Sequence, residues 1–257
     1  MLREDFKILC DQHFDKLFTD AKEKNEKQFF TSFFGFRKYG DYRILSYIID
    51  FEFQEIIELI KSLDSAQKIE EIDKRTKVRI ALLVYCHIIE VDFIYMVIFN
   101  LLYTIRGEDY DTLITFKSKN GDVIKVEYPS KKIKLINEKS EEVGIPLEEI
   151  FSEFYFNHLR NSFSHSQYYL HNDGHLQITW HLSPTSSKFM ESPHTIESYG
   201  FDELIEIYDK SIIYVKSFLG IYDKYMIDYQ DGKYHETIYY PLKYDKKHGW
   251  VFPGQVD

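Results

Sequence analysis

The sequence predicts a mainly α-helical protein, a helical bundle with inserted β-hairpins. Of its 257 residues 44% are hydrophobic and only 6 are proline, a composition typical of a globular chain with long helices. Apolar residues recur at helical spacing along several long segments. Since this length can bury one substantial core, we expect a single domain over residues 1–257, with the hairpins as additions to it.

Four long helices are expected, over residues 2–27, 41–63, 68–105 and 201–229. The first has apolar residues at helical spacing from Phe6 to Phe18, and Asp41 is a suitable N-cap for the second. A loop around Gly35 separates these two helices. The phenylalanines between Phe29 and Phe36 are expected to pack in the core.

The third expected helix ends in a stretch, Ile80 to Ile105, that is apolar enough to suggest a membrane span. His87, Glu90 and Asp92 lie in its middle, and each ionisable group at a bilayer centre costs about 2.5 to 3.5 kcal/mol. We therefore predict a central helix of the bundle and no membrane partner.

Three segments carry the alternation of a strand. Residues 112–136 alternate around Asn120-Gly121 and predict a β-hairpin, and shorter strands are expected over about 175–182, after the turn at Asn172, and about 236–242. Between them, Pro146 suits the first turn of a helix that continues from Ile150 through about Ser164.

Charge and cysteine content limit the class of protein. A net charge of −10 argues against nonspecific coating of nucleic acid, and the seven lysines between Lys117 and Lys139 are expected to protect the edge of the hairpin. Cys10 and Cys86 form no disulfide or metal pattern, and the first residues lack the apolar core of a secretory signal. We expect a cytoplasmic protein.

Polar groups concentrate in the stretch from Phe154 to Tyr169, around Arg160, Asn161 and His165. A helix that only had to pack would not carry them, because a buried polar group without a partner costs roughly 1 to 3 kcal/mol. Arg160 and His165 diverge by roughly 140° on an ideal helix. They can meet only in a groove at a helix end, where Asn161, four residues from His165, would hydrogen-bond the imidazole.

An imidazole, a guanidinium and an orienting amide are sufficient to cleave RNA without a metal ion or cofactor. A histidine near its usual pKa of about 6.5 exchanges the protons, and an arginine fork stabilises charge on phosphoryl oxygens. His165 would be the general base or the general acid. In this scheme a base removes the 2′-hydroxyl proton and the oxygen attacks the adjacent phosphorus. The product is a 2′,3′-cyclic phosphate.

The sequence Arg160-Asn161-Ser162-Phe163-Ser164-His165 resembles the R-x4-H motif of the HEPN superfamily, with Asn after the Arg. The resemblance implies a helical bundle that acts as a metal-independent endoribonuclease on an RNA substrate, with two motifs facing one another in a homodimer. Similar proteins are toxins or effectors of antiviral defence and abortive infection. It also implies catalytic roles for Arg160 and His165 and an orienting role for Asn161, with His87, Glu90 and Ser164 as supporting residues.

Other interpretations remain at this point. HEPN toxins silenced by a cognate inhibitor of the nucleotidyltransferase type carry a Tyr where this chain has Gln167, and some HEPN proteins bind RNA, nucleotide or a protein partner without cutting. The motif could also belong to an interhelical salt-bridge network, with Glu90 as a partner, that contains the pattern by chance. A plain helical interaction module would bury Arg160 and His165, sealed from solvent. The residue pattern alone fits each of these.

Two further features lie near the motif. Tyr168 and Tyr169 are candidates to stack on RNA bases, although core packing is the more ordinary role of such residues. Six histidines lie within a short span, and their spacing predicts no metal site because it lacks helical pairs and cysteine partners. These histidines are at positions 158, 165, 171, 175, 181 and 194.

Overall fold

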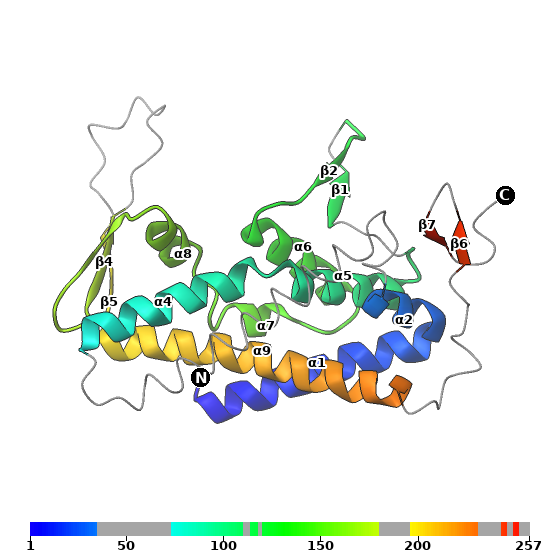
Figure 1. Ribbon diagram of the computed structural model, residues 1–257, viewed down its shortest axis with the longest axis horizontal. Coiled ribbons are helices and arrows are strands. Elements are labelled where there is room, and N and C mark those ends of the chain that lie inside the picture. Colours follow the sequence, from blue (N-terminus) through cyan, green and yellow to red (C-terminus); the bar gives the residue numbers. More distant parts are fainter. Residues whose placement is uncertain are drawn as a thin grey trace.

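The computed structural model describes residues 1–34, 73–109, 114–117, 120–179, 196–230, 243–245 and 249–251, and it is mainly helical with small antiparallel strand pairs (Figure 1). The predicted fold class is therefore confirmed. The predicted helix over 41–63, the loop around Gly35 and the strand over 236–242 lie outside the described residues.

The long helices α1 (Arg3–Lys24), α4 (Lys74–Glu90), α5 (Asp92–Arg106) and α9 (Phe201–Gln230) form the body of the protein (Figure 1). Phe14 packs on Tyr214 and Phe18 on Tyr225, so α1 and α9 run in the same direction. The start of α4 contacts the start of α9, where Lys74 lies over the Phe201 ring. The α4–α5 segment is therefore parallel to both.

Aromatic rings fill the space between these helices. Phe218 of α9 contacts Phe14, Phe18 and Phe93 at ring-centroid distances of 5.5, 5.8 and 6.3 Å, all edge to face. On α1 the apolar residues recur every three or four positions, so one face of that helix enters the core. Its buried residues are Phe6, Cys10, Phe14, Leu17, Phe18 and Ala21.

The first predicted helix is confirmed up to Lys24, where the chain turns at Asn25 and α2 (Glu26–Phe34) begins. Asn25 has an extended backbone, and its side-chain oxygen accepts a hydrogen bond from the Gln28 backbone N–H at 3.1 Å. That bond caps α2. Phe29 is fully buried, as expected for the start of the phenylalanine-rich segment.

The single helix predicted over 68–105 is wrong, because Val91 is extended and separates α4 from α5. No Pro or Gly marks this break. Tyr95 stabilises it by donating its hydroxyl proton to the Ile89 carbonyl at 3.0 Å, and Asp92 occupies the first turn of α5, where a negative charge is favourable.

The segment Lys74–Arg106 as a whole is long and apolar enough to cross a membrane. However, 78% of its most apolar window is buried inside the protein, as in the core helix of a soluble protein. Its interior position agrees with the predicted central helix of the bundle.

The predicted hairpin is present but shorter than expected. Strands β1 (Thr115–Lys117) and β2 (Val123–Lys125) pair in antiparallel register, whereas α6 (Pro129–Glu142) starts seven residues before the predicted end at 136, because Pro129 suits the first helical turn. The expectation that the lysines protect this edge is wrong for two of them. Lys132 is buried and pairs with Asp92, and Lys139 lies over the Tyr103 ring.

A second antiparallel sheet has the order β3 (Tyr168–Leu170), β4 (Leu176–Thr179) and β5 (Ile196–Tyr199). The strand predicted over 175–182 is confirmed as far as Thr179, and the rest of that range lies outside the described residues. The predicted turn before it contains Gly174 in the left-handed region, at φ 87°. A third pair, β6 (Lys243–Asp245) with β7 (Gly249–Val251), was not predicted.

The helix predicted from Ile150 to Ser164 is also wrong as one element. It is divided into α7 (Glu148–Phe151) and α8 (Asn157–Ser164) by a bend that ends at the extended residue Phe156. Phe151 and Phe154 both enter the core, and Phe154 contacts Tyr214 at 4.8 Å. The hydroxyl of Tyr85 on α4 accepts the Phe156 N–H at 2.9 Å. A residue distant in sequence therefore supplies the hydrogen-bond partner that this backbone N–H would otherwise lack at the bend.

Candidate functional site

Helix α8 ends at the predicted place, with His165 as its C-cap. The Gln167 N–H donates to the Ser162 carbonyl at 2.7 Å and the Ser166 N–H to the Phe163 carbonyl at 3.2 Å, which together form a Schellman motif. Ser166 adopts φ 55°, a left-handed conformation that is unfavourable for a residue with a side chain. The imidazole of His165 therefore leaves the helix just before a sharp change of chain direction.

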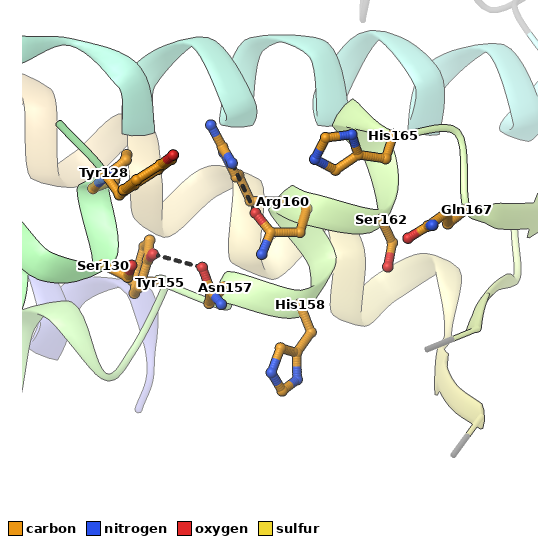
Figure 2. A pocket seen from close by; sticks show the side chains of 11 residues that line it. Tyr128, Ser130, Tyr155, Asn157, His158, Arg160, Ser162, His165 and Gln167 are labelled. Atoms are coloured by element: carbon orange, nitrogen blue, oxygen red, sulfur yellow. Dashed lines mark hydrogen bonds between the residues drawn. The ribbon is translucent and has the colours of Figure 1, made fainter. Parts of the chain in front are cut away.

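Arg160 and His165 line one open pocket of about 380 Å³ (Figure 2). Its wall comes from α8, from the bend before α8 and from the start of α6. Both side chains line the groove that was expected at the helix end. His165 is exposed, so the sealed arrangement expected of a plain interaction module is absent from the described part of the chain.

The guanidinium of Arg160 is oriented from two sides. One terminal nitrogen pairs with the carboxylate of Glu90 near the end of α4, and the other donates to Asn161 Oδ1 at 2.7 Å. Its Nε is buried and lacks a hydrogen-bond partner among the described residues. Each terminal nitrogen carries two hydrogens, so both keep donor capacity for an anion after these contacts.

The side chain of Asn161 contacts Arg160 and not the imidazole, so the expected hydrogen bond from Asn161 to the His165 ring is wrong. Asn161 and His165 are connected through their backbones instead. The Asn161 carbonyl accepts the His165 backbone N–H at 2.9 Å, which joins the two residues through the main chain. The amide is left free to hold the guanidinium.

Among the expected supporting residues, Glu90 contacts Arg160 and Ser164 contacts Cys86. Cys86 is nearly buried on α4, and burial raises the pKa of its thiol to about 12, although Arg160 and the hydrogen bond with Ser164 act in the opposite direction. The thiol is therefore protonated at neutral pH. His87 is exposed on α4 and has no hydrogen bond or ion pair with the described residues.

Several pocket residues were not singled out from the sequence. Tyr155, Asn157 and His158 belong to the polar stretch already identified, so their closeness to Arg160 was a usable signal. Tyr128 and Ser130 come from the start of α6, about 30 residues earlier, and no sequence pattern joined them to the motif.

His158 is the second imidazole of the pocket lining. Its Nδ1 lies 3.2 Å from Glu197 Oε1 on β5, and the other Glu197 oxygen accepts the Tyr199 hydroxyl at 2.9 Å. Because a carboxylate only accepts, Nδ1 carries the proton in this pair. Burial lowers the pKa of His158, while Glu197 acts to raise it.

Tyr168 and Tyr169 do not line the pocket. Tyr168 stacks on Phe163 with ring centroids 5.3 Å apart, and Tyr169 is 64% exposed beside His171 on the same sheet. Their candidate role in RNA binding therefore concerns a surface outside the pocket.

His171 and His175 meet at the β3–β4 turn, with ring centroids 5.5 Å apart. His181 and His194 lie outside the described residues. Within the described ranges no group of three or more His, Cys, Asp or Glu side chains is arranged to hold a metal ion.

Comparison of the chain with models of protein families, with curated proteins and with solved structures finds no match. The chemistry of the pocket is therefore the basis for inferring a function.

Proposed function

We propose that the protein is a metal-independent endoribonuclease of the HEPN type. The observation that supports this proposal is that Arg160 and His165, which an uninterrupted helix would point apart, open onto one solvent-accessible pocket. A general acid–base group beside a fixed cation is the minimum needed for phosphoryl transfer from an RNA 2′-hydroxyl.

In the proposed reaction His165 accepts the proton of the 2′-hydroxyl, and the oxygen forms a bond to the adjacent phosphorus. The bond from phosphorus to the 5′-oxygen breaks, and that oxygen takes up a proton from water as it leaves. The products are a 2′,3′-cyclic phosphate and a 5′-hydroxyl end. Arg160 stabilises the charge on the non-bridging oxygens through its remaining donors.

Phosphate can compete with Glu90 for Arg160. The Glu90 side chain is 44% exposed, and an ion pair accessible to water contributes only about 0 to 1 kcal/mol. Asn161 keeps the guanidinium in place during such an exchange, since its hydrogen bond uses the other terminal nitrogen. Arg160 and Asn161 therefore work as one anion-binding unit.

The proposal includes a homodimer in which two pockets face one another, in a cytoplasmic protein of antiviral defence, abortive infection or a toxin system that a cognate inhibitor restrains. An exposed strip of α4 beside the pocket supports a protein contact there. The strip contains Arg79, Leu83, His87 and Glu90, and Leu83 is 55% exposed.

The direct test incubates purified protein with structured and unstructured RNA in EDTA, beside the variants Arg160→Ala and His165→Ala. We expect the wild type to produce 2′,3′-cyclic phosphate ends, detected by mass spectrometry, and each variant to lose at least about a hundredfold in rate. Arg3→Ala and His175→Ala are matched controls away from the pocket, expected to retain the wild-type rate. Equal cleavage by all forms would disprove the active-site assignment.

A second candidate function is a catalytically inactive HEPN scaffold that binds RNA, nucleotide or a protein partner. The pairing of Arg160 with Glu90 favours it, because the guanidinium already has a carboxylate partner. RNA binding that Arg160→Ala abolishes, without cleavage by any form, would support the scaffold over the nuclease.

A further inference from the structure

A directed hydrogen bond occupies the part of the pocket next to α6. The Tyr155 hydroxyl donates to Asn157 Oδ1 at 3.1 Å (Figure 2). Burial raises the pKa of Tyr155, so the phenol keeps its proton and remains a donor at neutral pH. Tyr155 is therefore the donor and Asn157 Oδ1 the acceptor in this contact.

This direction of the hydrogen bond determines which atoms of Asn157 face the pocket. Its carbonyl oxygen is used by Tyr155, whereas its Nδ2 group carries two hydrogens and has no hydrogen-bond partner among the residues that the structure describes. Asn157 therefore presents donors to whatever occupies the pocket. A ligand group placed against Nδ2 must be an acceptor.

Tyr128 gives this part of the pocket an aromatic surface. It is the N-cap residue of α6, lines the pocket, and is 59% exposed. The ammonium of Lys131 lies 5.7 Å from its ring centre on one side, which leaves the opposite face for a planar ligand. A phenol ring of this exposure can stack on any nucleobase.

From these contacts we infer that Asn157 and Tyr128 form a nucleobase subsite that selects keto bases of unpaired RNA. The oxygen at position 6 of guanine or position 4 of uracil would accept from Nδ2, whereas adenine and cytosine carry amino groups at these positions. Unpaired bases are required because paired ones do not expose these edges to a pocket. The inference rests on the proposed function, since it places a nucleotide beside Arg160 and His165.

In this arrangement Tyr155 is a positioning residue. It contacts Asn157 and not the base, and it prevents the amide from turning its oxygen toward the pocket. Removing only its hydroxyl would leave the pocket volume almost unchanged and free the amide to rotate. Selectivity between bases would then fall while affinity for RNA is retained.

The test measures binding of fluorescent RNA hexamers by anisotropy, with His165→Ala as the background so that the RNA stays intact. U6 and C6 form the main comparison, because they differ by a keto or an amino group at position 4. Single guanine and adenine residues in an abasic backbone form the purine comparison. We expect about tenfold tighter binding of the keto member of each pair.

Variants in the same background separate the roles of the three residues. Asn157→Asp replaces the donors by an acceptor and is expected to reverse the order, so that C6 binds more tightly than U6. Tyr155→Phe should bring the ratio near one while changing the affinity for U6 less than threefold, and Tyr128→Ala should weaken all oligomers by a similar factor. Asn172→Asp, on the exposed β3–β4 turn, is the matched control and should change nothing.

Equal binding of U6 and C6 in the background protein, or a ratio unaffected by Asn157→Asp in protein that unfolds at the normal temperature, would overturn the inference. Its failure is distinguishable from failure of the nuclease. Cleavage without base preference would contradict the base-selective subsite alone. Selective binding without cleavage would contradict the proposed nuclease activity and support the subsite. Absence of RNA binding would contradict both proposals.

Discussion

Ser166 shows how one residue fixes the geometry of the pocket. It is a non-glycine residue with positive φ, and it directly follows His165 in the Schellman motif that ends α8. A left-handed backbone costs a residue with a side chain roughly 1 to 2 kcal/mol. The protein accepts that cost at the position where the chain leaves the helix for β3.

Replacement of Ser166 by Gly is expected to stabilise the protein. The gain should be about 0.5 to 1 kcal/mol in the free energy of unfolding, because glycine adopts this conformation readily but loses more entropy on folding. Urea denaturation measures the difference. Ser152→Gly is the matched control, since Ser152 is right-handed at φ −62° and should lose stability, and a loss in both variants would contradict this account.

The contact between Glu153 and Lys210 should make the stability of the protein depend on pH. The hydrogen bond from Lys210 at 2.8 Å holds the pKa of its carboxyl below the usual 4.5. A carboxyl whose pKa is lower in the folded state adds stability above about pH 4.5, and that contribution is lost as the pH falls through the folded-state pKa. Urea denaturation from pH 7 to 3 should show a shallower acid decline for Glu153→Gln than for the wild type. Parallel curves would disprove the role of this pair.

At the scale of elements, two helix breaks are stabilised by tyrosine hydroxyls. The bend before α8 depends on Tyr85 of α4, whose hydroxyl accepts the Phe156 N–H. The break at Val91 depends on the Tyr95 hydroxyl, which donates to the Ile89 carbonyl. In both places a side chain replaces the backbone hydrogen bond that a continuous helix would make.

Tyr85→Phe should therefore destabilise the protein by about 1 to 2 kcal/mol, because it leaves the Phe156 N–H without its partner. Thermal and urea unfolding measure the loss. Tyr214→Phe is the matched control: Tyr214 is also buried, but its hydroxyl has no hydrogen-bond partner among the described residues, so removing it should be neutral or stabilising. Equal losses would indicate a general effect of deleting a buried hydroxyl.

Periodicity predicted α1, α9 and the β1–β2 hairpin because local residues determine those elements. The same method joined α4 to α5 and α7 to α8, because neither Val91 nor Phe156 is a breaker residue. The hydroxyl at Phe156 comes from Tyr85, which is distant in sequence, and the hydroxyl at Val91 comes from the nearby Tyr95, whose role the apolar spacing does not indicate. At the site, the spacing of Arg160 and His165 implied a helix end, which the structure contains. The contributions of Tyr128 and Ser130 depend on how α6 packs, which local sequence does not encode.

For the whole molecule, much of the aromatic core lies between the parallel helices α1 and α9. Phe218 is fully buried among rings from both α1 and α5. Phe218→Ala should cost about 3 to 5 kcal/mol in the free energy of unfolding, measured by urea denaturation. Ile8→Ala, at an exposed position of α1, should change it by less than about 0.5 kcal/mol. A similar effect of both substitutions would contradict the assigned core.

The break at Val91 also has an evolutionary consequence. Glu90 on one side of it pairs with Arg160 of α8, and Asp92 on the other side pairs with Lys132 of α6, so two neighbouring acids each hold one wall of the pocket. A change of charge at one member of a pair leaves the other uncompensated. In descendants of this chain, positions 90 and 160 should therefore change together, positions 92 and 132 should change together, and the two pairs should vary independently of each other.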